Sequence, residues 1–238
     1  MKFILNLFNI IFCLLAINTL YSQNESSKKP IEIGVNLIKQ NTFYHSGVVD
    51  VELNSSNFAY GLSLSIPISN FLNFHTGLQL SNQGQNFLIE TSNNSTGTEP
   101  IYSDIEMELQ YIKVPLQFKL GGNKLNNKRL TLNFILGPQL SFLKKATSTV
   151  DEAESNYSKS MNNLTIDIAG GIEVDVKIIK NIYFNLGYRF DYSITSAEPK
   201  TSLHYYYNSP GVAAQSGTKK ITTHNRTSGC LFGLSVIF

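Results

Sequence analysis

The feature that most constrains the fold is an alternation of apolar and polar residues with a period of two. In residues 182–192, aromatic and aliphatic side chains alternate with small, polar or charged ones. This period places alternate side chains on opposite faces of a β-strand. The same pattern predicts strands at residues 31–37, 58–66, 72–81, 112–119, 131–142, 164–177, 182–193 and 228–238. The chain is therefore expected to be all-β, with about eight strands of a length that can cross a bilayer.

The connections between these strands alternate in length. Three are short, at Ser69–Asn70, residues 121–129 and residues 179–181. The others are longer and rich in Ser, Thr, Asn and Gly, at residues 39–56, 91–103, 144–161 and 194–225. Short turns at one end and long loops at the other are typical of barrels in bacterial outer membranes.

The polar face of the strands carries charge. A sheet crosses a bilayer only when it closes and leaves no unpaired edge, so the apolar face must turn outward and the polar face inward. An eight-stranded barrel is nearly filled by its own side chains. We therefore expect a closed antiparallel up-and-down transmembrane β-barrel with an ion-paired, plugged interior. The expected inward side chains include Glu32, His75, Lys113, Lys119, Asp167, Glu173, Asp175, Lys177, Arg189 and Asp191.

One group of these charges raises the question of a site. Glu173 and Asp175 lie on one predicted strand, and Arg189 and Asp191 on the next. Cross-strand ion pairing that holds the barrel closed explains them better than a catalytic carboxylate pair does.

A soluble β-sandwich or a lipocalin-like periplasmic barrel explains the period of two equally well. It explains the one-sided long loops and the charged inward face less well. Charged residues make up only 15% of the chain, which is low for a water-exposed surface. The formal net charge of +2 gives no reason to expect a nucleic-acid partner.

The first residues have the pattern of an export signal. Lys2 is followed by an apolar run over residues 3–16 and then by a polar stretch. We predict a signal peptide at residues 1–22, cleaved near Ser22, and a barrel domain at residues 23–238. Cys230 would then be the one cysteine of the mature chain, in a packing or lipid-facing position.

Aromatic and glycine residues also have expected places. Aromatic side chains near strand ends form girdles at membrane interfaces. The candidates are Tyr60, Phe71, Phe142, Tyr183 and Tyr192. Glycines inside a barrel relieve crowding where strands coil tightly. Those expected to lie mostly on the inward face are Gly34, Gly61, Gly77, Gly137, Gly171, Gly187, Gly229 and Gly233.

Several segments resemble a known family. Residues 111–116 (YIKVPL), 136–141 (LGPQLS), 167–173 (DIAGGIE) and 187–192 (GYRFDY) resemble successive strand motifs of a barrel family common in Bacteroidetes, which includes PorT-like and OmpA-like small barrels. Asn225-Arg226 resembles its approach to the last strand. The resemblance covers most of the mature chain, although Ala169 stands where that family usually has glycine.

The resemblance implies an outer-membrane location and lipid contact, and little about activity. PorT-like members assist type IX secretion, so an envelope or secretion-complex partner is one expectation. The terminal Phe238 is similar to the aromatic end residue that the barrel-assembly machinery reads. We expect a non-enzymatic barrel that serves envelope structure, binding through its loops, or assistance to secretion.

Little in the sequence indicates chemistry. His45, His75, His204 and His224 lack metal-ligand spacing, and no cofactor motif is present. One alternative is a lipid-modifying enzyme at the barrel rim, with candidates in His204 with Ser202 and in His45 with Ser46. A narrow channel is another. The run Tyr205–Tyr207 suggests either a recognition surface or an aromatic rim.

Overall fold

The computed structural model describes residues 30–46, 53–92, 101–121, 129–150, 153–156, 158, 161–197, 205–206, 215–216 and 223–238. The predicted signal peptide lies outside these residues. The strands are β1 (Glu32–Ser46), β2 (Leu53–Pro67), β3 (Leu72–Ser92), β4 (Ile101–Gly121), β5 (Leu130–Val150), β6 (Ala153–Asn156), β7 (Leu164–Ile179), β8 (Ile182–Ser193), β9 (Tyr205–Tyr206), β10 (Gln215–Ser216) and β11 (Thr223–Ile237).

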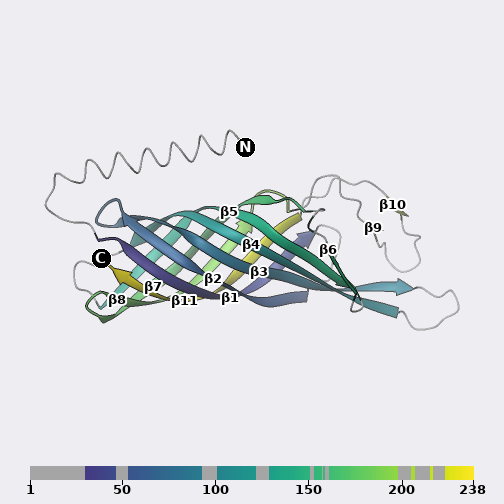
Figure 1. Ribbon diagram of the computed structural model, residues 1–238, viewed down its shortest axis with the longest axis horizontal. Helices are drawn as coiled ribbons and strands as arrows, with labels where there is room; N and C mark the ends of the chain where they lie inside the picture. Colours follow the sequence, from purple (N-terminus) through teal and green to yellow (C-terminus); the bar gives the residue numbers. More distant parts are fainter. Residues whose placement is uncertain are drawn as a thin grey trace. The chain divides into compact units, whose positions relative to one another are not determined.

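Eight of these strands close into an antiparallel barrel. The hydrogen-bonded order is β4-β3-β2-β1-β11-β8-β7-β5, and pairing of β5 with β4 completes the ring (Figure 1). The short β6 adds to β5, and β9 pairs with β10 in a separate two-stranded sheet. The predicted fold is therefore confirmed.

The pairing register fixes the tilt of the strands. Followed around the barrel, the pairings that start at Tyr111 return to β4 at Gly121, ten residues further along the strand. This stagger over eight strands gives a tilt of about 40° to the barrel axis. Each residue then advances about 2.5 Å along the axis.

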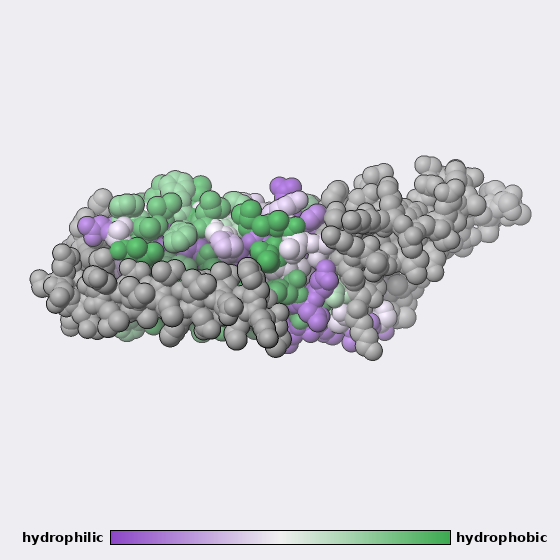
Figure 2. Space-filling view, turned by 90° about the horizontal axis from the view of Figure 1, so that it is seen from above, coloured by the Kyte–Doolittle hydropathy of each residue, from purple (hydrophilic) through white to green (hydrophobic). Residues whose placement is uncertain are grey.

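The alternation of faces agrees with the prediction. Leu62, Phe134 and Tyr188 are among the many large apolar side chains exposed on the outside, whereas Lys119, Asp175 and Gln117 are buried inside. Figure 2 shows apolar side chains over one part of the barrel and hydrophilic ones gathering toward the end where the long connections lie. The outward face of the strands therefore suits lipid.

Several strands extend further than the sequence pattern predicted. β1 continues through Ser46, β3 to Ser92, β4 begins at Ile101 and β5 continues to Val150. The expected long loops at residues 39–56, 91–103 and 144–161 are correspondingly shorter. β3, β4 and β5 reach beyond the other strands at the loop end (Figure 1).

One aromatic residue was placed on the wrong face. Tyr60, Phe71, Phe142 and Tyr192 are exposed on the outside, as expected for interfacial residues. Tyr183 is only 2% exposed, because its position in the alternation of β8 turns it into the lumen. It cannot belong to an aromatic girdle.

Gly137 illustrates the predicted glycine crowding. A Cβ atom built there would lie 2.6 Å from the Leu116 carbonyl oxygen and 2.7 Å from the Gln117 Cα of the neighbouring strand. Both atoms belong to backbone, so a side chain at this position would force the strands apart.

Among the residues that the structure describes, no helix has the length and hydropathy needed to cross a membrane.

Candidate functional site

The lumen near the short turns contains a buried charge cluster centred on Lys119. Its Nζ lies 2.5 Å from Glu173 Oε1, 3.3 Å from Asp175 Oδ2 and 3.5 Å from Glu32 Oε1. Asp175 also accepts hydrogen bonds from Asn133 (2.7 Å) and Asn185 (2.5 Å). One cation therefore links carboxylates from β1 and β7 across the interior.

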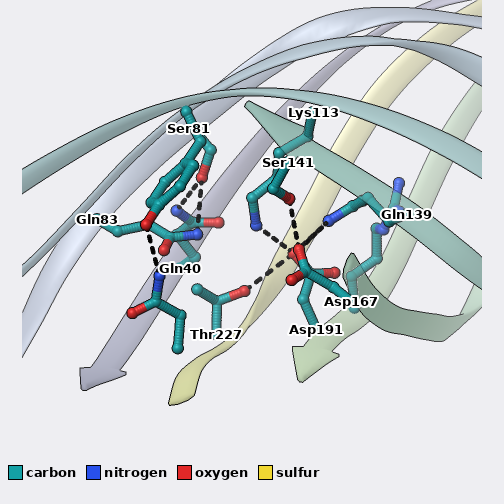
Figure 3. Close-up of polar contacts among 12 residues, drawn as sticks. Gln40, Ser81, Gln83, Lys113, Gln139, Ser141, Asp167, Asp191 and Thr227 are labelled. Atoms are coloured by element: carbon teal, nitrogen blue, oxygen red, sulfur yellow. Dashed lines mark hydrogen bonds and ion pairs between the residues drawn. The ribbon is translucent and has the colours of Figure 1, made fainter. Parts of the chain in front are cut away.

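A second cluster lies nearer the loop end. Lys113 Nζ is 2.6 Å from Asp191 Oδ2, which also accepts hydrogen bonds from Thr227 (3.1 Å) and Gln139 (3.3 Å). Gln139 bridges to Asp167, and Ser141 donates to the same Asp167 oxygen (Figure 3). Figure 3 shows these side chains converging from several strands. The network ties β4, β5, β7, β8 and β11 together.

The predicted pairing partners were partly wrong. Glu173 and Asp175 bind Lys119, and Asp191 binds Lys113, both of which come from β4. Arg189 instead donates a hydrogen bond of 3.2 Å to Gln117. These charges therefore pair across the lumen, where strands that are not neighbours in the sheet approach each other.

A serine–histidine pair also lies inside the lumen. Ser65 Oγ is 2.9 Å from His75 Nδ1, and both residues are buried. The adjoining cavity, which His75, Gln79 and Arg189 help to line, holds only about 10 Å³. That volume suits about one water molecule. The pair therefore lacks room for a substrate and contributes to the polar packing.

Other cavities lined by described residues are equally small. One lies between Lys113, Asp167 and Asp191, and another between Gln40, Asp191 and Thr227; each measures about 10 Å³. Single-water spaces separated by side chains do not form a continuous path. These spaces agree with the prediction that side chains nearly fill a barrel of this size.

A buried apolar cluster, called the cap, lies on the β4 and β5 side of the barrel at the loop end. Leu109, Tyr111 and Ala146 of β4 and β5 are buried against Met161 and Ala197, which lie in the connections around β7 and β8. The two connections are joined to each other, since Asn162 donates from its backbone to Ala197 O (2.7 Å) and from its side chain to Ser196 O (2.8 Å).

The outward face beside this cap is hydrophilic. Glu106 and Glu108 of β4 and Lys144 and Lys145 of β5 are exposed, and Lys145 lies 3.2 Å from Glu154 of β6. On β4 and β5 the polarity is thus reversed here, with apolar side chains inside and charged ones outside. We call this part of β3, β4, β5 and β6 the extension, residues 82–92, 101–111, 143–150 and 153–156.

The extension was missed by the sequence reasoning, although its signal is present. Residues 106–111 alternate acidic or amide side chains with Met107, Leu109 and Tyr111. The period is still two, but the apolar positions continue the inward face of β4. The alternation with a period of two therefore predicts that β4 extends through residues 106–111, provided that the apolar face is allowed to point inward.

The candidate residues of the enzyme hypothesis lie largely outside the described structure. Ser202, His204 and Tyr207 are not described, and of His45, Ser46, Tyr205 and Tyr206 only the backbone is. His224 donates a hydrogen bond of 2.8 Å from Nδ1 to Ser193 O, and its ring stacks on Tyr192. Among described residues, no group of His, Cys, Asp and Glu has the arrangement of a metal site.

Comparison with known proteins identifies the family. A family model described as outer membrane protein β-barrel domain matches residues 19–197, more than half of the chain. No curated protein sequence matches this chain. The chain belongs to the outer membrane protein β-barrel domain family and is an outer-membrane barrel.

Solved structures similar to this chain are also outer-membrane proteins. Neisserial surface protein A is 12% identical, with 87% of this chain and 97% of that one covered and a TM-score of 0.43. A major outer membrane protein from Thermus thermophilus is 9% identical, with coverages of 87% and 99% and a TM-score of 0.42. OprG from Pseudomonas aeruginosa is 12% identical, with coverages of 88% and 94% and a TM-score of 0.35.

Proposed function

We propose that this member of the outer-membrane β-barrel family is a non-enzymatic, non-conducting binding protein that acts through its extension. The observation that carries the proposal is the reversal of polarity at the loop end. There the apolar cap of Leu109, Tyr111 and Ala146 is buried on the inward side of β4 and β5, while the outward face becomes charged. The long connections of such barrels lie outside the cell, so this surface would face the exterior.

The filled lumen supports the absence of conduction. The Lys119 and Lys113 networks occupy successive levels of the interior, and the cap lies above them. An ion would have to break buried ion pairs to pass, which is costly in a medium of low polarity.

The extension supports a binding role because it is a rigid platform. β3, β4 and β5 each have 21 residues, whereas β8 has 12, so the excess length is paired backbone. Sites held on strands are more precisely placed than sites on loops. Its mixed charges, with Glu106 and Glu108 beside Lys144 and Lys145, favour a protein partner over a polyanion.

A photocrosslinking experiment tests this role. A benzoylphenylalanine at Glu108 would be activated on intact cells, with the same residue at the lipid-facing Leu186 as the matched control. The expected result is a discrete protein adduct from position 108 and none from position 186. Identical labelling from both positions, or no adduct from position 108, would contradict a binding role of the extension.

The identity of the adduct distinguishes the finer roles. A secretion-complex component would support assistance to secretion, as in PorT-like barrels, and another envelope protein would support a structural role. Folding would be checked by heat-modifiable gel mobility.

Recognition of Phe238 by the barrel-assembly machinery is part of the same proposal. The Phe238 side chain is 75% exposed.

Planar-bilayer recording tests the channel alternative. The purified wild-type barrel is expected to give no stable conductance steps. Steps that are lost in a Lys113→Met variant would show that ions pass the Lys113–Asp191 level, and the non-conducting proposal would then be wrong.

A further inference from the structure

The outward face of β1 and β11 departs from that of the neighbouring strands. On β8 this face is apolar or aromatic through Phe190, Tyr192 and the following Ile194. On β1 and β11 the exposed large apolar residues stop at Leu37 and Phe232, and the half-buried Phe43 follows on β1 close to the loop end. The outward positions directly above Leu37 and Phe232 are Lys39 and Asn41 on β1 and Cys230, Ser228 and Arg226 on β11. We call these five residues the notch.

The register shows that the notch has apolar walls. Lys39 pairs with Cys230 on one side and with Phe58 of β2 on the other. Arg226 pairs with Phe43 and with Tyr192 of β8. Phe58 and Tyr192 are both exposed on the outside. A short polar strip therefore runs down from the loop end between two apolar surfaces that face lipid.

The notch lies at the upper edge of the apolar band. Arg226 is paired with Tyr192 across the sheet, and Tyr192 is the outward aromatic residue nearest the loop end of β8. Lys39 is lower than Arg226 by about 7 Å along the barrel axis, given the tilt and the register. The long stem of a lysine lets its ammonium group rise toward the headgroups while its methylene groups stay in lipid. Both cations can thus reach the headgroup level.

The two cations have no described counter-charge. Neither Lys39 nor Arg226 forms an ion pair with a residue that the structure describes, and both are exposed. The described outward positions of β8, β11, β1 and β2 include no Asp or Glu. The Arg226 guanidinium lies 6.0 Å from the centre of the Phe43 ring, which is a cation–π contact.

Cations on a lipid-facing surface are costly unless an anion compensates them. Lysine and arginine bind phosphate by charge-assisted hydrogen bonds, and juxtamembrane cations attract anionic lipid headgroups. We propose that the notch binds a phosphate-bearing headgroup of an outer-leaflet lipid, with Lys39 and Arg226 as its two anchors. The lipid's acyl chains would lie on the apolar surface below, beside Leu37 and Phe232.

The surroundings favour a lipid over a soluble anion. The notch opens onto the apolar band and not into the lumen, where Lys113 and Lys119 are already paired with carboxylates. The two anchors are also separated along the axis, which suits an elongated headgroup seated at the interface. This proposal needs only the outer-membrane barrel and is independent of a partner for the extension.

Nanodiscs provide the test. Wild-type protein would be reconstituted in phosphatidylcholine containing a minor fraction of lipid A, and retained lipid A would be measured by native mass spectrometry. The variant is K39Q/R226Q, and the matched control is K144Q/K145Q, which removes two exposed cations from the extension. Each cation is worth about fivefold in binding to an anionic surface, so the notch variant should retain lipid A roughly twenty-five-fold more weakly.

The control variant should retain lipid A within about twofold of the wild type, because the cations that it lacks lie above the lipid-facing band and one already pairs with Glu154. Equal retention by the notch variant and the wild type would overturn the proposal. Competition by inorganic phosphate as effective as by lipid A would overturn the assignment to a lipid. If the double variant does not fold, as judged by heat-modifiable gel mobility, the single variants K39Q and R226Q would be measured in its place.

Discussion

The part of the barrel within the apolar band and the extension use the same alternation with opposite polarity. Within the band, Leu186 and Phe134 face outward while Lys119 and Asp175 are buried inside. In the extension, Glu108 is exposed and Leu109 is buried. Since backbone pairing continues through both parts, the difference reflects the solvent outside each one.

The changeover coincides with an irregularity in the sheet. The pairing of β4 with β5 shifts between Gln110 and Tyr111, where β5 has an extra residue and both Lys144 and Lys145 are exposed. A bulge of this kind re-aims the side chains that follow it. It brings Ala146 inward to join Leu109, so the apolar cap forms directly above the last polar level of the lumen.

The largest expected effect comes from the buried cation of the membrane-spanning part. Lys119→Met leaves Glu32, Glu173 and Asp175 in the lumen without their shared partner. Removing one side of a buried ion pair costs about 3–5 kcal/mol. The loss in the free energy of unfolding would be measured by urea titration of heat-modifiable gel mobility.

The matched rescue is the double variant Lys119→Met/Glu173→Gln, which also removes one of the stranded carboxylates. It should recover part of the lost stability. A Lys119→Met barrel as stable as the wild type would mean that the cluster is not a closed ion-pair network.

The second effect tests where the lipid-facing surface ends. Leu186→Lys places a charge on the outward face of β8, within the apolar band, and should cost about 2–4 kcal/mol in lipid vesicles. Glu108→Lys makes the corresponding change on the outward face of the extension and should have an effect within about 0.5 kcal/mol. Similar costs at both positions would show that the extension also contacts lipid.

The sequence predicted the faces well because alternation is a local property. Each residue's side of the sheet depends only on its position in its own strand, so burial of Lys113, Asp167 and Glu173 could be read directly. Tyr183 was misplaced when its aromatic character was given more weight than its position.

The pairing of charges could not be predicted in the same way. Lys119 belongs to β4 and Glu173 to β7, and β5 lies between these strands in the sheet. Their contact depends on the stagger of the closed barrel and on the narrowness of its lumen, neither of which a single strand encodes. The sequence therefore indicated that ion pairs would form but not which residues would form them.

The third effect is expected in the cap. Leu109→Ala removes a buried side chain that packs with Tyr111 and Met161, and it should destabilise the barrel by about 2 kcal/mol. Leu78→Ala is the matched control on the lipid face, where acyl chains can fill the space that the shorter side chain leaves. It should cost less than about 1 kcal/mol. The same urea titration measures both, and equal losses would mean that the cap is not a packed core.

The smallest effect concerns the exposed ion pair of the extension. Lys145 and Glu154 lie 3.2 Å apart, with side-chain exposures of 47% and 61%, whereas Lys119 is 1% exposed. A double-mutant cycle with Lys145→Met and Glu154→Gln should give a coupling energy below about 1 kcal/mol that decreases with added salt, since water screens this pair. A coupling as large as that of Lys119, or one insensitive to salt, would place the pair in a desolvated environment. The extension would then be covered by a partner or by lipid, and the contrast between the two parts of the barrel would no longer hold.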